Sequence, residues 1–241
     1  MNRQAVNPYL PSWEYIPDGE PHVFNGRVYV YGSHDRFNAP IFCVNDYVCW
    51  SAPVEDLSEW RYEGVIYRKK QDPKNPLGYH LLFAPDVCQG PDGRYYLYYA
   101  FDFLGIMSVA VCDTPAGEYK FLGHIHYADG TLWGRRRGDQ LPFDPGVLLD
   151  DDGRVWLYSG FYNAVPAILT GGHKLRCDGG TVLELEKDMV TIKTEPRVIF
   201  PKKGPGAFQG HEFFEASSIR KEGKTYIFVY SSRHNHELCY A

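Results

Sequence analysis

The 241-residue sequence lacks the features that most easily identify membrane, nucleotide-binding and nucleic-acid-binding chains. No stretch approaches the roughly 18–20 apolar residues of a membrane-spanning helix, and the first twenty residues contain no continuous apolar segment typical of a secretory signal. The motifs GxGxxG, GxxxxGK[ST], GxSxG and HExxH are absent, which argues against the usual nucleotide, esterase and zinc-protease sites. The net charge of −5 does not suit nucleic-acid binding. We therefore expect neither a membrane nor nucleic acid as a partner.

Cysteines and histidines are also not arranged as metal ligands. The six cysteines show no CxxC spacing, so we interpret them as reduced thiols and, in the absence of a signal segment, expect a cytoplasmic protein. Two close histidine pairs, His124 with His126 and His234 with His236, have no third ligand beside them in the sequence. Because a metal site needs at least three such ligands, no metal site is predicted.

Aromatic and turn-forming residues are abundant, which favours an all-β fold. Phe, Trp and Tyr make up 16% of the chain, alongside 24 Gly and 17 Pro. Four segments resemble one another, each with a polar residue, a glycine, a cation and then a β-branched or aromatic run: NGRVYVYGS, DGRYYLYYA, DGRVWLYSG and EGKTYIFVYSS, beginning at residues 25, 92, 152 and 222. These segments predict four β-hairpins whose two turn residues both adopt positive φ.

The spacing of these hairpins predicts a β-propeller. Their turn glycines, Gly26, Gly93, Gly153 and Gly223, are 67, 60 and 70 residues apart, and apolar strands precede and follow each hairpin. Repeats of three or four antiparallel strands are typical of propeller blades, whereas a two-sheet sandwich would not explain the similarity. We therefore expect one incomplete propeller domain over residues 1–241, with repeats at roughly 15–75, 76–135, 136–205 and 206–241. Only 18 residues follow Gly223, so about three and a half blades are expected, as a fragment of a longer protein.

Each repeat also carries a carboxylate shortly before its turn glycine. Asp18, Asp86, Asp144 and Glu215 lie 7–9 residues upstream of it. If the first strand of every blade lines the axis, four acids converge there and raise one another's pKa, which suits paired acid and base catalysis. Taken singly, the aspartates can also be ordinary turn formers. Glu215 lies among aromatic residues in HEFFEASSI, where a raised pKa would suit a general acid.

These segments resemble glycoside hydrolase family 43 along essentially the whole chain. The matching motifs are IPDGEPHVFNGRVYVYGSHD, LLFAPDV, FDPGVLLDDDGRVWLYSG and FFEASSIRKEGKTYIFVYSS. The resemblance implies a five-bladed propeller that cleaves xylosidic or arabinofuranosidic linkages with inversion. It implies that Asp18 is the general base, Glu215 the general acid, and Asp144 the residue that orients the acid and raises its pKa. Asp86 is implied to line the sugar pocket.

The sequence departs from the family pattern where a pocket wall is expected. Phe83 stands where the family often has Trp, so the preference between xylose and arabinose stays open. Phe83, Trp13 and Trp133 are candidates for stacking on sugar rings, with core packing as the alternative. No cofactor is required by this reading, although the resemblance allows an axial structural ion such as calcium. The expected partner is an oligosaccharide substrate, and the oligomeric state is not indicated.

Two other function classes remain alternatives at this stage. A non-catalytic glycan-binding propeller would use the same scaffold, because a fold does not fix a function. A propeller enzyme of another kind, such as a fructan hydrolase or a glycoside phosphorylase, is the second. Fructan hydrolases need carboxyl groups only about 5–5.5 Å apart, and phosphorylases need a basic phosphate pocket that the expected channel strands do not indicate.

Overall fold

The computed structural model describes residues 7–241 and contains four antiparallel sheets. The first sheet consists of β1 (Glu20–Phe24), β2 (Arg27–Tyr31), β3 (Tyr47–Pro53) and β4 (Arg61–Tyr67). The second consists of β5 (Asp86–Gln89), β6 (Tyr95–Ala100), β7 (Met107–Cys112) and β8 (Lys120–His124). The third consists of β9 (Gly146–Leu149), β10 (Val155–Phe161), β11 (Gly179–Leu185) and β12 (Arg197–Pro201). The fourth consists of β13 (Phe213–Glu222), β14 (Thr225–Ser232) and β15 (Leu238–Tyr240).

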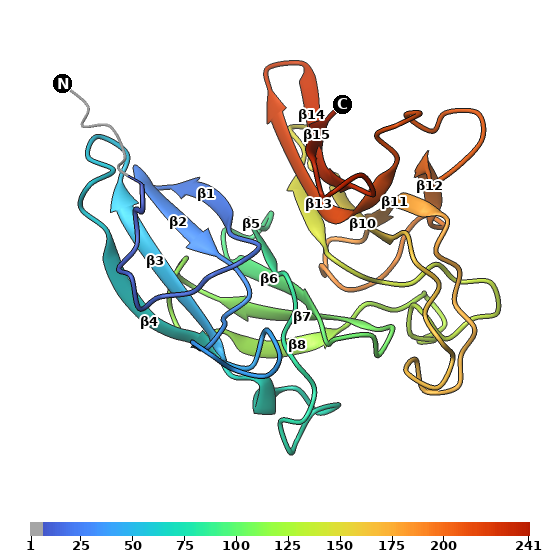
Figure 1. The fold of residues 1–241 in the computed structure, drawn as a ribbon, viewed down its shortest axis with the longest axis horizontal. Helices are drawn as coiled ribbons and strands as arrows, with labels where there is room; N and C mark the ends of the chain where they lie inside the picture. The colour runs from blue at the N-terminus through green and yellow to red at the C-terminus, as the bar shows by residue number, and fades with distance from the viewer. Residues whose placement is uncertain (1–6) are drawn as a thin grey trace.

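The sheets follow one another in a ring, as in a β-propeller (Figure 1). Within every sheet the strands pair in chain order. The first strands of neighbouring sheets contact one another, β5 with β9 and β9 with β13, so they lie nearest the axis. The described residues form a single short 3-10 helix, Lys69–Gln71. The all-β propeller prediction is confirmed, with three sheets of four strands and a fourth sheet of three.

The four hairpins form where predicted, but their turns differ in type. Only the first has positive φ at both turn residues, Asn25 (50°) and Gly26 (75°). Gly93 and Gly153 lie in longer loops. Each has positive φ and donates its N–H to the carbonyl three residues earlier. Gly223 (58°) is the first residue of a two-residue turn. The prediction of paired positive φ was therefore wrong for three hairpins: the two longer loops take another turn type, and in the last, two-residue turn only Gly223 has positive φ.

Aromatic side chains fill the space between neighbouring sheets. One core cluster joins the second and third sheets and includes Tyr98, Met107, Leu157 and Leu183. Trp133 belongs to the same cluster and is fully buried. Its role is therefore core packing, the alternative given for it above, and not sugar stacking.

Two findings bear on the expected environment of the protein. Within residues 7–241, no helix has the length and apolar character needed to cross a lipid bilayer. All six cysteines are described and free, four of them buried. The cytoplasmic location stays a prediction.

Candidate active site

Three of the four predicted carboxylates meet in one cavity of about 270 Å³ at the axis of the ring. Asp18 lies two residues before β1, Asp144 lies two residues before β9, and Glu215 lies within β13. Each acid therefore comes from a different sheet. Because the first strands of the sheets lie side by side around the axis, residues distant in the sequence are brought to the same end of that axis.

The backbone around these acids adopts conformations that are uncommon for residues with a side chain. Asp18 (φ 56°), Asp144 (46°) and Ala216 (62°) all lie in the left-handed region. The Ala216 N–H donates a 3.0 Å hydrogen bond to Asp144 Oδ2, which ties β13 to the end of the loop before β9. Residues in this region cost free energy and concentrate at functional sites. From this backbone, the side chains of Asp144 and Glu215 both line the same cavity.

Burial raises the pKa of all three carboxylates. Asp144 is the most deeply buried, and burial followed by the charges of Glu215 and Asp18 raises its pKa well above the ordinary value. Burial and then the charge of Asp18 raise the pKa of Glu215 to about 7. The pKa of Asp18 is raised by burial, against a 2.8 Å hydrogen bond donated by Ser33 Oγ.

Asp144 and Glu215 act on each other through charge and through the backbone. The charge of Glu215 contributes to the raised pKa of Asp144, in line with the expected repulsion between the two carboxyl groups. The charge of Asp18 also raises the pKa of Glu215. In addition, Asp144 accepts the hydrogen bond from Ala216, the residue that follows Glu215.

Aromatic rings form most of the remaining wall of the cavity. Phe83, the predicted wall residue, lines it together with Phe42, Phe103, Phe143 and Phe161. Phe103 and Phe143 stack with their ring planes 4° apart, and Phe83 contacts both rings edge-on. A cavity with apolar ring faces and a few convergent carboxyl groups suits a sugar, whose C–H faces pack on rings and whose hydroxyls bind carboxylates.

Asp86 does not line this cavity, contrary to the expectation that all four acids converge. It is the first residue of β5 and is fully buried, and Val147 N–H donates to its Oδ2 at 2.6 Å. Its other oxygen lies 2.6 Å from His22 Nε2. Ala84, two residues earlier, lines the cavity in its place. Asp86 therefore joins the second and third sheets.

Trp13 also lies outside the residues that line the cavity. It is 66% exposed, and its ring contacts Trp50 at a centroid distance of 5.9 Å. Of the three predicted substrate-binding residues, only Phe83 is placed beside the three acids.

The cavity contains polar residues that the sequence reasoning missed. Asp35 and Cys43 line it, and the Cys43 N–H donates to Asp35 Oδ1 at 2.5 Å. Both lie in the long connection between β2 and β3. This connection has no alternating strand pattern from which the direction of its side chains could be predicted. Ser33, which donates to Asp18, could have been predicted from the sequence, because it lies two residues after the second strand of the first hairpin.

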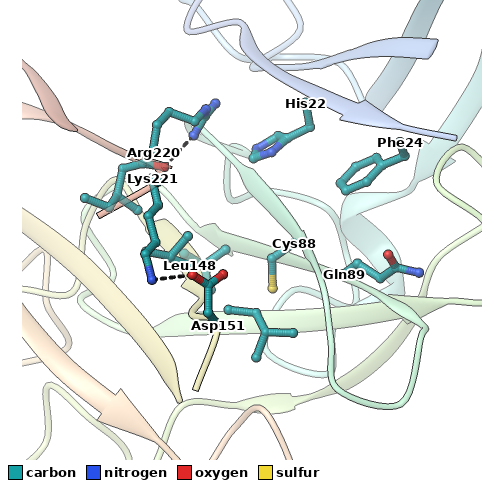
Figure 2. A pocket seen from close by; sticks show the side chains of 12 residues that line it. His22, Phe24, Cys88, Gln89, Leu148, Asp151, Arg220 and Lys221 are labelled. Carbon is teal, nitrogen blue, oxygen red and sulfur yellow. Dashed lines mark hydrogen bonds and ion pairs between the residues drawn. The ribbon is translucent and has the colours of Figure 1, made fainter. Parts of the chain in front are cut away.

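A second cavity of about 420 Å³ lies farther along the same first strands (Figure 2). His22, Cys88 and Arg220 line it, and Lys221 Nζ pairs with Asp151 at 2.8 Å. Asp18, Asp144 and Glu215 do not line it. It is therefore distinct from the cavity that holds the three acids.

Beside the second cavity, Glu20, His22 and Asp86 place their ligand atoms within 4.8 Å of one another. Calcium prefers six to eight oxygen ligands, whereas this group offers two carboxylates and an imidazole. Asp86 already binds His22 and a backbone N–H, and Glu20 accepts hydrogen bonds from Ser218 and Arg220. These residues do not fit a calcium ion, because their oxygens have partners and a guanidinium lies beside them.

Comparison with known proteins identifies the chain's relatives. The sequence profile of glycosyl hydrolases family 43 matches residues 17–239. A xylosidase/arabinosidase of Thermoclostridium stercorarium is 61% identical over the full chain, which spans 50% of that relative. A xylosidase/arabinosidase of Bacteroides ovatus is 31% identical over 97% of the chain and 75% of its own length.

Solved structures show the same fold. A β-xylosidase/α-arabinofuranosidase from a compost microbial metagenome, in complex with xylotriose and in a calcium-free form, superposes with a TM-score of 0.71 at 27% identity. That alignment covers the full chain and 77% of the other. The RS223 β-xylosidase gives a TM-score of 0.70 at 25% identity, over 94% of the chain and 74% of that protein.

Proposed function

Because the chain belongs to glycosyl hydrolases family 43, we propose that it hydrolyses xylosidic or arabinofuranosidic linkages of oligosaccharides by an inverting mechanism. The observation that carries this proposal is the meeting of Asp18, Asp144 and Glu215 in one cavity, with the pKa of Glu215 raised to about 7. A general acid works best when its pKa lies near the working pH.

In the proposed reaction, Glu215 and Asp18 act on opposite sides of the anomeric carbon. Glu215 donates its proton to the glycosidic oxygen as the bond from that oxygen to the anomeric carbon breaks. Asp18 accepts a proton from a water whose oxygen forms the new bond to the same carbon from the other face. The Ser33 hydroxyl, which donates to Asp18 Oδ2, supports the ionised form that a base requires.

Asp144 is proposed to be a positioning residue. It accepts the N–H of Ala216, the residue after the acid, and so fixes the backbone that carries Glu215. Burial and the charges of Glu215 and Asp18 raise its pKa, and the charge of Asp18 raises the pKa of the acid. This arrangement separates the roles of two carboxyl groups by their environments.

The substrate class rests on the cavity and on the relatives. The aromatic walls formed by Phe83, Phe103 and Phe143 suit stacking on a pentose ring. Two relatives carry the name xylosidase/arabinosidase, and the compost enzyme was solved with xylotriose. A glycan-binding propeller without catalysis would have no need of three buried acids with raised pKa, which favours an enzyme over that alternative.

The test is a panel of nitrophenyl β-xyloside and nitrophenyl α-arabinofuranoside, with the anomer of the released sugar followed by NMR. We expect hydrolysis of at least one substrate, with the product formed first in the configuration opposite to that of the substrate. Asp18→Ala is expected to abolish turnover of both substrates, while the exposed Asp152→Ala serves as the matched control and keeps full activity. Initial release of the retained anomer would reject the mechanism, and activity in Asp18→Ala would reject the assigned base.

A further inference from the structure

A histidine, a glutamate and a cysteine come together at the end of the fourth sheet. His211 precedes β13, Glu237 precedes β15, and Cys239 lies within β15. One ligand atom from each lies within 4.8 Å of the other two. His211 Nδ1 and Glu237 Oε2 are 2.9 Å apart. These side chains belong to neither the catalytic cavity nor the axial group.

Backbone pairing holds the three side chains on one side of the sheet. Cys239 is directly opposite Tyr230 in the β14–β15 pair, and it is half-buried while its neighbours Leu238 and Tyr240 are more than 80% exposed. The Tyr230 hydroxyl donates to the His211 carbonyl at 2.7 Å. Ser232 N–H donates to the Glu237 carbonyl at 2.9 Å. Strand pairing and these hydrogen bonds thus hold the backbone of all three candidate ligands in place.

We propose that His211, Glu237 and Cys239 form a binding site for a divalent cation of the zinc class. Imidazole nitrogen, carboxylate oxygen and thiolate sulfur are the ligands that zinc takes in proteins, and a water completes a tetrahedron around it. The 2.9 Å separation of His211 and Glu237 requires little change to become the edge of such a tetrahedron. The cation replaces the hydrogen bond between them and displaces the thiol proton of Cys239.

From the sequence, only histidines that are close together in the chain were considered, and no metal site was predicted from them. His234 Nε2 lies 3.1 Å from Glu212, and His236 Nδ1 lies 3.7 Å from the catalytic Glu215. Neither His234 nor His236 belongs to the group of three possible ligands. That group contains a different histidine, His211, which precedes β13. The chain separation between residues 211 and 237 hides this triad from any short motif.

Cobalt(II) is the probe for this site, because a thiolate bound to cobalt gives a charge-transfer absorption in the near ultraviolet. The reduced wild-type chain is expected to bind one Co²⁺ with this absorption, and Zn²⁺ is expected to displace it. Cys239→Ser should lose the absorption, and His211→Gln should weaken binding at least about tenfold. Binding should strengthen as pH rises, since two ligands must lose protons.

Cys112→Ser is the matched control, because Cys112 is the other half-buried cysteine and lies on the second sheet. It should bind Co²⁺ like the wild type. Melting curves without metal verify that each variant is folded, and the exposed His211 keeps the test available should Cys239→Ser fail to fold. Absence of the absorption in the wild type, its survival in Cys239→Ser, or its loss in Cys112→Ser would each overturn the proposal.

Discussion

At the residue scale, the proposed chemistry depends on three carboxyl groups that differ in burial and in hydrogen bonding. Asp144 is buried and accepts one backbone N–H, whereas Asp18 accepts a hydrogen bond from a hydroxyl, and its charge raises the pKa of Glu215. The surroundings of these carboxyl groups therefore shift their pKa values by different amounts. Two predictions test this division.

Glu215→Gln is expected to remove proton donation while leaving the base in place. Hydrolysis of unactivated xylo-oligosaccharides should fall by about 10²–10⁴-fold, the usual contribution of general acid catalysis. Nitrophenyl glycosides should lose much less, because their leaving group needs little protonation. The measurement is kcat/KM on both substrate types. Equal losses on the two would contradict the assignment of Glu215 as the acid.

Asp144→Asn is expected to make the protein more stable at high pH while it lowers activity. The folded-state pKa of Asp144 lies above its unfolded value near 3.8. Its stabilising contribution is therefore complete below about pH 4 and falls by about 1.4 kcal/mol per pH unit, until Asp144 ionises in the folded protein. Asparagine keeps an oxygen that can accept the Ala216 N–H. Because asparagine does not ionise, the variant does not lose this stability as the pH rises.

Urea unfolding at pH 5, 6, 7 and 8 measures this difference. The free energy of unfolding of Asp144→Asn relative to wild type should increase with pH until Asp144 ionises in the folded wild-type protein, and then stay constant. Asp152→Asn is the control, since Asp152 is exposed and its pKa is lowered, not raised. A constant difference across the four pH values would show that Asp144 ionises as freely in the folded chain as in the unfolded one.

At the element scale, the position of Asp144 depends on a close approach between β9 and β13. Gly146, the first residue of β9, allows this approach, because a Cβ built there would lie 2.5 Å from the Ser217 carbonyl oxygen. Gly146→Ala should force the strands apart, destabilise the fold by about 1–3 kcal/mol and lower kcat by displacing Asp144 from Ala216. Urea unfolding and steady-state kinetics measure the two effects.

Gly123→Ala is the control for this substitution. Gly123 is also a strand residue, in β8, but its Cβ would meet only Val190 at an ordinary contact distance of 3.5 Å. Its activity should equal that of the wild type. If Gly146→Ala were as active as Gly123→Ala, the approach of β9 to β13 would have no part in positioning the acid.

The strands were predictable from the sequence because each hairpin repeats a local pattern, but counting along the chain placed one carboxylate wrongly. Asp86 was equated with Asp18 and Asp144 by its distance from a turn glycine. Asp86 lies 7 residues before its glycine and Asp144 lies 9 before its own, although five residues connect β5 to β6 and five connect β9 to β10, so the two acids do not hold equal positions. Counted from the strand start, Ala84 is the equivalent residue. Asp35 and Cys43 were not predictable, since their irregular loop is placed by tertiary contacts.

At the scale of the whole molecule, the first and fourth sheets are joined by polar contacts near the axis. Ser218 Oγ donates to Glu20 Oε1 at 2.8 Å, and Arg220 also binds Glu20. Arg220 Nη2 donates to the Pro21 carbonyl at 2.8 Å. The contact spans residues almost 200 positions apart, so it links the sheets without any shared strand.

Arg220→Leu is expected to weaken the contact between these sheets and destabilise the protein by about 2 kcal/mol, because the largely buried Glu20 loses its cation and the Pro21 carbonyl loses its donor. Arg94→Leu is the control: Arg94 pairs with the exposed Asp92 within one sheet, and its loss should change the free energy of unfolding little.

Glu20→Gln combined with Arg220→Leu should recover part of the lost stability, since it removes the uncompensated charge. Denaturant unfolding of the two single variants and the double variant measures that coupling. Strictly additive losses would mean that the two side chains act independently and that their ion pair does not stabilise the contact between the sheets.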